Sequence, residues 1–398
     1  MKVLYLSARF PWPPHRGDRL TGYHLIRALS QKHDVTLASF VDGSETREGI
    51  WELAGMCRRI QTVHLPRRRS WAQAWLGMLY SEPSQVSYYR SAAMHRRVRA
   101  LLSEEKPDVV FVQLFRMAPF ARHLQHPCKV LFLADSLALS LQRSLPFQPW
   151  HRRRAVEWER RRVSAYEPLV ARDFRESWVL SDVDQRDLEE RGCTNVAVVP
   201  HGVDDRLFDL PLTPRTLPRV TFLGNLSVPH NVDAAIYLVE KVWPRILAAR
   251  PDAELELVGA DPVDAVLALA SARGVRVTGP VPSLAPVWER SAVLLAPLRF
   301  STGIQNKVLE AMAAGVPVVT TPQAAEAIHA REGEHLRVGD SDETLANAAL
   351  ELLAGGERAM PMVARARELV RAQFTWQTLV ARLEHLAGAN AVAKELVR

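Results

Sequence analysis

The sequence contains few cysteines and no long apolar run, and both absences restrict the possible classes of protein. Among its 398 residues are three cysteines, Cys57, Cys128 and Cys193, which are odd in number and show no CxxC spacing. Disulfides and a cysteine zinc site are therefore not expected, which is consistent with a reducing cytoplasm. No stretch reaches the roughly 18 consecutive apolar residues of a membrane-spanning helix, so we expect no transmembrane segment.

The N-terminus also lacks the pattern of a signal peptide. Its apolar run covers only residues 3–6 and is followed by Arg9 and three prolines. This run is shorter than the apolar core of a signal peptide and is typical of a first β-strand. We therefore expect a cytoplasmic protein.

Charge and length leave several partner classes open. The net charge is +7 and the isoelectric point is near 9.5. This excess permits binding to nucleic acid, to an anionic membrane or to phosphorylated ligands, and it selects none of them. The length predicts two domains of roughly 190 residues each.

Apolar runs of strand length alternate with helical periodicity along the whole chain. In the first half these runs cover residues 3–7, 35–39, 60–64, 109–112, 130–133, 178–181 and 196–199. In the second half they cover residues 220–223, 255–258, 275–278, 293–296 and 316–320. This alternation predicts an α/β fold with two parallel sheets and helices on both faces. We place a first domain at 1–204, a linker at 205–218 and a second domain at 219–373.

The segment 293–320 has the most specific pattern. It contains an apolar run, a polar turn at 300–303, helical spacing over 304–314, Gly315 as a helix stop, and a second apolar run. Free N–H groups at a helix N-terminus attract anions, and Glu310 lies two turns into the expected helix. This combination suits a nucleotide that carries phosphates and ribose hydroxyls. An ordinary βα turn has the same pattern, so the pattern alone leaves both interpretations open.

The sequence of this segment resembles the signature of glycosyltransferase family four, whose members are retaining GT-B enzymes that use nucleotide sugars. The family form is Glu, Gly, six residues, and then EAMAxGxPVV. Here Gly303 precedes EAMAAGVPVV at 310–319. The resemblance implies that Glu310 binds the donor ribose, and that Gly303 and Ile304 approach the phosphates. Thr302 replaces the first glutamate, which in the family lies at the donor sugar.

Other matches extend the resemblance. The sequence PHGVD at 200–204 is similar to the family's domain junction. Gly224 matches a glycine turn, but Asn225 replaces the arginine that neutralises the diphosphate in many members. The loop with Gly279 and Val281 is similar to the family's loop beside the nucleobase. The region after residue 373 is similar to the family's C-terminal helix, so we expect 374–398 to return to the first domain.

The expected diphosphate needs positive charge. Arg299 and Lys307 flank the proposed anion turn, although both also have the alternative interpretation of solvated surface charges. No DxD pair lies where a Mg²⁺–diphosphate site would need it. The literal matches at 182–184 and 340–342 are typical of helix N-termini. We therefore expect no metal and no cofactor, with a UDP- or GDP-sugar as the donor substrate.

Two positions in the first domain are candidates for the acceptor side. Gly17 matches a family glycine loop near the donor phosphates and the acceptor, although an ordinary βα loop is an alternative. Asp135 follows the strand at 130–133, where many members have His-Asp. It is expected to orient the acceptor hydroxyl or to take its proton. Gln113 stands where many members have histidine, and His15 and His201 are interpreted as loop residues.

Two basic stretches with tryptophan, at 65–71 and 150–154, favour contact with an anionic membrane. Solvated helix faces are the alternative. Nucleic acid would also fit the charge, but no recognised binding module accompanies it, so no nucleic-acid partner is expected.

The resemblance implies two Rossmann-like doubly wound domains facing a cleft. It also implies transfer of a sugar to a saccharide or polyprenyl-linked acceptor. The phrases GIQNKVLEAMA and VPHNVD, at 303–313 and 228–233, are most similar to a bacterial exopolysaccharide and exosortase branch. This branch places the enzyme at the inner face of the membrane. A GT-B epimerase or hydrolase and a non-catalytic sugar-nucleotide-binding protein remain alternatives, the latter because of Thr302 and Asn225.

Overall fold

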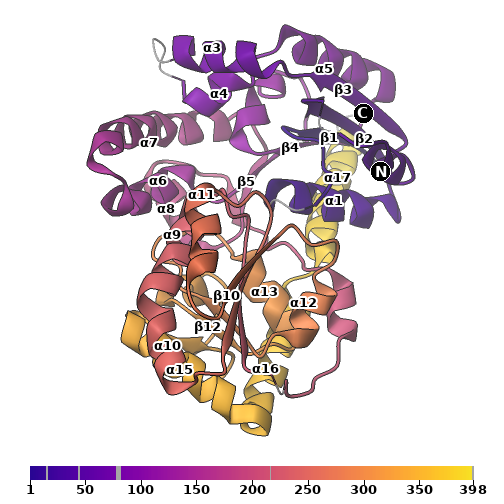
Figure 1. Cartoon of the computed structure of the whole chain (residues 1–398). Helices are drawn as coiled ribbons and strands as arrows, with labels where there is room; N and C mark the ends of the chain where they lie inside the picture. Colours follow the sequence, from indigo (N-terminus) through magenta and orange to yellow (C-terminus); the bar gives the residue numbers. More distant parts are fainter. Residues whose placement is uncertain (15–16, 44, 78–81, 216, 397–398) are drawn as a thin grey trace. The chain divides into compact units, whose positions relative to one another are not determined.

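The computed structural model describes residues 1–14, 17–43, 45–77, 82–215 and 217–396. The chain forms two compact units (Figure 1). One comprises Met1–His201 together with Trp376–Arg398, and the other comprises Gly202–Thr375. Each unit is built on one parallel sheet with helices on its faces, as the alternating pattern of the sequence predicts.

The first unit contains a seven-stranded sheet in the order β3-β2-β1-β4-β5-β6-β7. Its strands are β1 (Lys2–Ser7), β2 (Asp34–Val41), β3 (Arg59–His64), β4 (Val109–Gln113), β5 (Lys129–Ala134), β6 (Glu176–Val179) and β7 (Val196–Val198). Its helices are α1 (Gly17–Ser30), α2 (Arg47–Ala54), α3 (Arg67–Gly77), α4 (Ser84–Tyr88), α5 (Ala92–Glu105), α6 (Leu137–Ser144), α7 (Trp150–Ala171), α8 (Asp182–Glu190) and α17 (Trp376–Leu396). The central strands are buried on both faces, which explains why they are continuous apolar runs in the sequence.

Helix α17 belongs to the first unit and packs beside α1 (Figure 1). At its start Trp376 is stacked between two buried imidazoles, those of His24 and His201, with ring centroids 5.3 and 5.4 Å away. Further along, Glu384 accepts a 2.7 Å hydrogen bond from His33. Ring stacking and polar contacts therefore attach the last helix to the N-terminal sheet domain.

The second unit contains a six-stranded sheet in the order β10-β9-β8-β11-β12-β13. Its strands are β8 (Arg219–Leu223), β9 (Glu254–Val258), β10 (Val275–Gly279), β11 (Val293–Ala296), β12 (Val318–Thr320) and β13 (Arg337–Val338). Its helices are α9 (Pro229–Tyr237), α10 (Trp243–Ala249), α11 (Asp264–Leu267), α12 (Ala285–Arg290), α13 (Asn306–Ala313), α14 (Pro322–Glu326), α15 (Asp342–Gly355) and α16 (Met360–Gln373). Strand β13 has only two residues and no apolar run, so the sequence did not predict it.

The end of α13 explains why the next strand begins later than predicted. Gly315 has a φ of +71°, and the N–H of Val316 donates a 2.9 Å hydrogen bond to the carbonyl of Ala311. This is the glycine stop that the sequence predicted. Because residues 316 and 317 complete the stop, β12 starts at Val318.

The described residues of the stretch 205–218, for which a linker was predicted, belong to the second unit. It contains a short 3₁₀-helix, Asp205–Asp209. The guanidinium of the buried Arg367 donates to the carbonyls of Phe208 and Leu210 at 2.6 and 2.7 Å. Buried hydrogen bonds to its backbone therefore hold the first part of this stretch in place.

In both sheets the strand order reverses at one point, between β1 and β4 in the first unit and between β8 and β11 in the second. Ligands of open parallel sheets bind beyond the carboxyl ends of the strands at such a point. The candidate residues are therefore sought in the turns that follow these strands. Within the part of the chain that the structure describes, no helix meets the length and hydropathy required to span a membrane.

Candidate functional site

The turn that follows β11 carries several of the predicted residues. The helix predicted over 304–314 is α13 and begins only at Asn306, so Ile304 lies in the preceding turn. Gly303 has a φ of +62°, and Gln305 is extended, with its side chain donating a 3.1 Å hydrogen bond to the carbonyl of Thr302. These conformations keep residues 302–305 out of the helix, although the apolar spacing continues through them. Gly303 and Ile304 are thus turn residues ahead of the helix N-terminus.

Glu310 is a nearly buried carboxylate in the middle of α13, with 7% of its surface exposed. No hydrogen-bond donor reaches its side chain from within residues 1–14, 17–43, 45–77, 82–215 and 217–396. Burial raises the pKa of Glu310; the charge of Lys307 opposes this rise, and that of Asp204 adds to it. Because no donor from the described residues satisfies the oxygens of this carboxylate, a ligand hydroxyl is a fitting partner.

Lys307 lies one turn earlier on α13 and is also buried, with 6% of its surface exposed. Its ammonium donates to the side-chain oxygens of Asn231 at 2.8 Å and Gln305 at 3.3 Å, and lies 5.7 Å from the centre of the Phe222 ring. Burial lowers its pKa, while the charge of Glu310 acts in the opposite direction. The surface-charge interpretation of Lys307 is therefore wrong. Its hydrogen-bond acceptors are both neutral amides.

Asn231, in the first turn of α9, is the residue of this site that the sequence analysis missed. Its amide nitrogen donates a 3.0 Å hydrogen bond to the backbone carbonyl of Asn225, while its amide oxygen accepts from Lys307. A β-carbon on Gly224 would lie 2.8 Å from the Asn231 side chain, so this position requires glycine. Asn231 thus connects the turn after β8 with α13 across the reversal of strand order. Its only signal was its place in the phrase VPHNVD.

Asn225 shapes the turn after β8. Its amide nitrogen donates to the Asp261 carboxylate at 2.9 Å, and its amide oxygen accepts from the hydroxyl of Ser227 at 2.6 Å. The side chain is 9% exposed. The amide group of Asn225 therefore forms its hydrogen bonds within the fold. Lys307 supplies the positive charge at this edge of the sheet.

Arg299, the second predicted counter-charge, is paired with other residues of the second unit. Its guanidinium forms a two-point ion pair with the carboxylate of Asp233 and lies over the ring of Tyr237, 4.8 Å from the centroid. Both partners belong to α9. A phosphate would have to compete with Asp233 for this guanidinium, so Lys307 is the better placed of the two cations.

Gly279 and Val281 lie at the end of β10, two strands away from β8. Gly279 has a φ of +70°, and its carbonyl accepts a 3.1 Å hydrogen bond from the N–H of Gly259. A β-carbon on Gly259 would collide with the carbonyl of Gly224. The turns after β8, β9 and β10 are therefore in direct contact through their backbone groups.

The predicted residues of the first unit lie at the carboxyl ends of its strands. Gly17 begins α1, and no atom lies within 4 Å of the position that a β-carbon would take there. His15 lies outside the described residues. Gln113 is buried and bridges the Ser7 hydroxyl, at 3.0 Å, and the carbonyl of Asp18, at 2.6 Å. Gln113 thus supports the turn structure at the reversal between β1 and β4.

Asp135 directly follows β5 and is half-buried. Its neighbour Ala134 has a φ of +71°, a conformation that non-glycine residues rarely adopt. Asp135 and Gly17 belong to the first unit, whereas Thr302, Lys307 and Glu310 belong to the second.

The two DxD matches lie at helix N-termini, as predicted. Asp182 and Asp184 are in the first turn of α8, and Asp342 is in the first turn of α15, where Ser341 and Thr344 form a capping box. Within the described ranges, no three histidine, cysteine, aspartate or glutamate residues are grouped so that they could hold a metal ion.

Comparison with known proteins agrees with this geometry. Residues 217–355 match a family model described as glycosyl transferases group 1. The matched residues all lie in the second unit. A 92-residue segment is 41% identical to the GDP-mannose-dependent alpha-(1-6)-phosphatidylinositol monomannoside mannosyltransferase of Mycobacterium tuberculosis; it covers 22% of this chain and 24% of that protein. A 214-residue segment is 27% identical to the monoacylated-substrate mannosyltransferase of Corynebacterium glutamicum and covers 47% of this chain and 55% of that protein.

The matched segments thus span between about a quarter and about half of these curated relatives. Solved structures match over almost the whole chain. Sucrose-phosphate synthase from Thermosynechococcus elongatus superposes with a TM-score of 0.70 at 17% identity, covering 99% of this chain and 100% of its own. HepE from Anabaena, solved with UDP-glucose, gives a TM-score of 0.67 at 13% identity, covering 98% and 100%. The fold is GT-B, and together the findings support a glycosyltransferase.

Proposed function

We propose that this protein transfers a sugar from a nucleotide diphosphate sugar to a saccharide acceptor, with retention of anomeric configuration. The observation that carries the proposal is the pair of buried residues on α13, one acidic and one basic. Glu310 offers an acceptor that no donor of the described residues satisfies, and Lys307 offers a cation held by two neutral amides. A ribose hydroxyl fits the first and a diphosphate fits the second.

Lys307 would stabilise the diphosphate as it departs. Negative charge grows on the leaving oxygen when the bond to the sugar breaks, and a fixed cation in a water-poor site stabilises such charge strongly. The N-terminus of α13 adds backbone N–H groups that attract the same anion. Thr302, in the turn before α13, is proposed to face the donor sugar. Its hydroxyl can donate or accept a hydrogen bond but carries no charge.

We propose that the reaction needs no metal, because a lysine and a helix N-terminus provide the positive charge. Activity should therefore survive EDTA. Complete loss on chelation, restored by Mg²⁺ or Mn²⁺, would contradict this part of the proposal.

The donor is proposed to be a UDP- or GDP-sugar. The mannosyltransferases to which the chain is similar are described as dependent on GDP-mannose, and HepE was solved with UDP-glucose. The base would lie against the glycine-rich turns at Gly259 and Gly279, where backbone groups provide the contacts. Side chains therefore give no direct indication of which base is bound.

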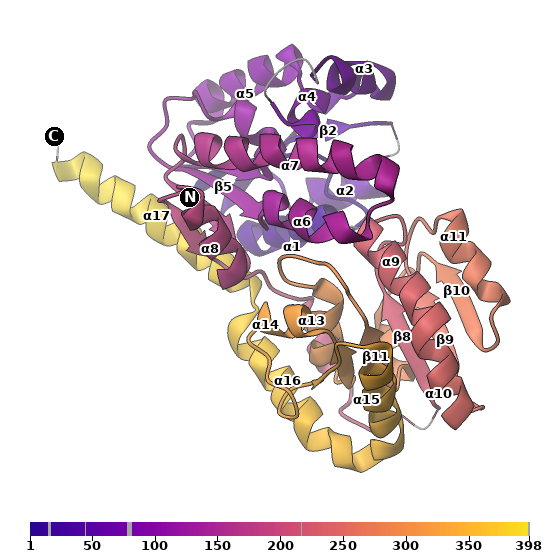
Figure 2. The same cartoon turned by 90° about the vertical axis from the view of Figure 1, so that its left-hand side faces the viewer.

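The acceptor is proposed to be lipid-linked, in bacterial exopolysaccharide or cell-surface glycan synthesis, at the inner membrane. The first unit exposes large aromatic side chains: Trp51 (77%), Trp71 (62%), Trp75 (69%) and Trp150 (83%). Three of them lie on helices α3 and α7, which are labelled in Figure 2. The two helices are joined where Arg162 donates a 2.8 Å hydrogen bond to the carbonyl of Gly77. Exposed tryptophans beside arginines suit the interface of an anionic bilayer.

Not every arginine of these stretches is available to a membrane. Arg67 is paired with Asp42 at 2.7 Å, and Arg153 donates to the carbonyls of Gln148 and Pro146. Four others are exposed and, within the described ranges, form no ion pair and no side-chain hydrogen bond: Arg68, Arg69, Arg152 and Arg154. These four are the proposed contacts with anionic lipid.

A donor-turnover assay with and without membrane extract tests the proposed function. Release of nucleotide diphosphate that depends on the extract, with label transferred to lipid, supports it. Turnover without any acceptor would instead indicate an epimerase or hydrolase. Binding without turnover would indicate a non-catalytic binding protein.

A further inference from the structure

The turn between β5 and α6 is held in an unusual conformation. Ala134 has a φ of +71°, and its carbonyl accepts a 2.9 Å hydrogen bond from the N–H of Leu180. The pairing of β5 with β6 shifts register at this point. Such a conformation is disfavoured for a residue with a β-carbon and persists only where the surroundings hold it. The next residue is Asp135.

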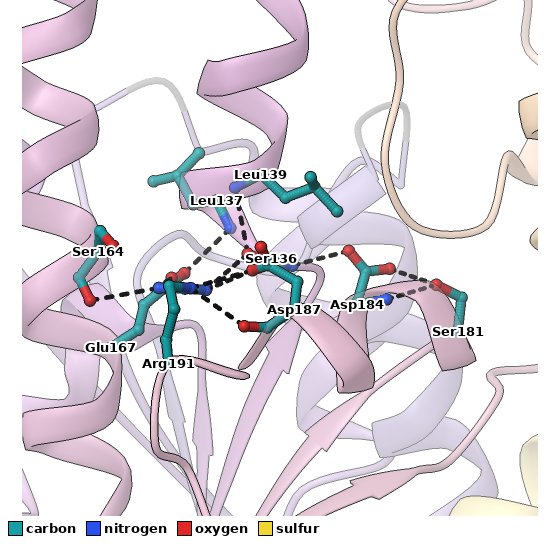
Figure 3. A network of polar contacts seen from close by, with 9 residues as sticks. All are labelled: Ser136, Leu137, Leu139, Ser164, Glu167, Ser181, Asp184, Asp187 and Arg191. Carbon is teal, nitrogen blue, oxygen red and sulfur yellow. Dashed lines mark hydrogen bonds and ion pairs between the residues drawn. The ribbon is translucent and has the colours of Figure 1, made fainter. Parts of the chain in front are cut away.

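Two buried carboxylates hold the chain immediately after Asp135 (Figure 3). The N–H of Ser136 donates to Asp184 at 3.0 Å, and the N–H of Leu137 donates to Glu167 at 3.0 Å. Glu167 lies on α7 and Asp184 on α8, and neither has any exposed surface. Hydrogen bonds to carboxylates are stronger than those between neutral groups. The backbone on this side of Asp135 is therefore fixed by two separate helices.

Arg191, just after α8, joins these helices to the same turn (Figure 3). Its guanidinium lies 2.8 Å from Glu167 and 2.6 Å from Asp187, and it donates a 2.8 Å hydrogen bond to the Ser136 hydroxyl. The Ser136 hydroxyl in turn donates to Asp187 at 2.6 Å. One cation thus serves two carboxylates at the turn that follows Asp135.

We propose that Glu167 and Arg191 are positioning residues for Asp135, and that ionised Glu167 strengthens Asp135 as the proton acceptor for the sugar acceptor's hydroxyl. This inference rests on the proposed function, in which Asp135 faces the acceptor. Two neighbouring carboxylates raise each other's affinity for protons, so each becomes a stronger base than it would be alone.

The electrostatics of Glu167 support this coupling. Burial raises its pKa to about 7; the charge of Asp135 adds to this rise, and Arg191 opposes it. Among the described residues, Arg191 and Cys193 after α8 and Asp135 after β5 interact electrostatically with Glu167, and Asp187 on α8 shares the cation Arg191 with it. Because the repulsion between Glu167 and Asp135 is mutual, removing the charge of Glu167 should weaken the hold of Asp135 on a proton.

Glu167→Gln tests the proposal in the full chain, with Glu157→Gln as the matched control. Glu157 lies on the same helix and is paired with Arg160 and Arg161, away from the turn. In Glu167→Gln we expect kcat for transfer to fall about ten- to a hundredfold, with KM for the nucleotide sugar changed less than about threefold. The acid limb of the pH–kcat profile should move to lower pH. Glu157→Gln should behave as wild type.

Because Glu167→Gln places an amide beside Arg191 and can lower folding stability, Ser136→Ala serves as a second variant. It keeps both backbone hydrogen bonds and loses only the hydroxyl contacts, so a fall of about three- to tenfold in kcat is expected. Wild-type kcat and pH profile in either folded variant would overturn the proposal, as would a fully active Asp135→Asn. A wild-type protein that transfers no sugar would instead refute the proposed function itself.

Discussion

The ammonium of Lys307 donates a 2.8 Å hydrogen bond to the side-chain oxygen of Asn231, and this bond connects α13 with α9 across the reversal of strand order in the second unit. It holds a buried cation in place without neutralising it. The cation therefore remains available to an anionic ligand, whereas Arg299 is already paired with Asp233.

Substitutions at Asn231 should distinguish the effect of the position of Lys307 from the effect of its charge. Asn231→Ala leaves Lys307 its charge but loses its 2.8 Å partner, so donor affinity should fall about three- to tenfold. Asn231→Asp gives Lys307 an anionic partner and places a negative charge near the phosphates, so affinity should fall at least about a hundredfold. Isothermal titration with nucleotide sugars measures both. Equal effects of the two substitutions would mean that Lys307 does not contact the phosphates.

Glu310→Gln should stabilise the ligand-free protein, and more so as pH rises. Burial raises the pKa of Glu310 in the folded state, so between its ordinary and its raised pKa the folded chain holds one proton more than the unfolded chain. The free energy of unfolding therefore decreases with rising pH over this window. Glutamine cannot ionise, so the free energy of unfolding of the Glu310→Gln variant does not decrease for this reason.

Thermal unfolding at pH 5 and pH 8 measures this effect. The variant's advantage in Tm should be small at pH 5 and larger at pH 8, by about 2–4 °C for each kcal/mol of relieved cost. Lys307, whose pKa is lowered, acts with the opposite slope only at higher pH. Glu240→Gln, at an exposed position of the same unit, is the control. A constant difference at both pH values would show that Glu310 does not titrate in this range.

Thr302→Glu restores the charge that the family signature has at this position. If Thr302 faces the donor sugar, a carboxylate there should change donor preference or abolish transfer. Binding of nucleotide diphosphate should change little, because the substitution touches the sugar and not the ribose. Unaltered kinetics with every donor would show that the turn before α13 is placed differently against the ligand.

Much of the fold could be predicted from the sequence, because buried parallel strands are continuous apolar runs and Gly315 marks a helix end. The burial of a charged residue could not be predicted from the sequence. The sequence left open whether Lys307 is a counter-charge at the turn or a surface charge. Its burial becomes visible only with Asn231, which is 76 residues away in the chain. The same holds for the turn after Asp135, because Glu167 and Arg191, which bind its residues Leu137 and Ser136, lie far along the sequence.

The residue at which α13 begins could also not be predicted from the sequence pattern. Ile304 continues the apolar spacing of the helix, but Gly303 and Gln305 adopt non-helical conformations. Such local backbone geometry is decided by contacts around the turn and leaves no trace in the periodicity.

Contact with membranes should depend on the four arginines for which no other described residue is an ion-pair or side-chain hydrogen-bond partner. Each basic residue near an anionic surface contributes about 1 kcal/mol, and salt screens this attraction over about 10 Å at 0.1 M. We expect co-sedimentation with anionic liposomes at low salt that is lost when Arg68, Arg69, Arg152 and Arg154 are replaced by Gln. Replacing the engaged Arg67 and Arg153 instead should have a much smaller effect. Failure of the wild type to bind anionic liposomes would favour a soluble acceptor.

The most direct test of the account is the affinity of wild type and Glu310→Ala for UDP- and GDP-sugars, measured by calorimetry in the presence of EDTA. A hydrogen bond to a charged group contributes roughly 1.5–3 kcal/mol, which corresponds to about a ten- to hundredfold change in affinity. The account predicts that wild type binds at least one of these donors and that Glu310→Ala, still folded, binds it that much more weakly. Equal affinity in the two proteins would contradict the assignment of the donor site to α13.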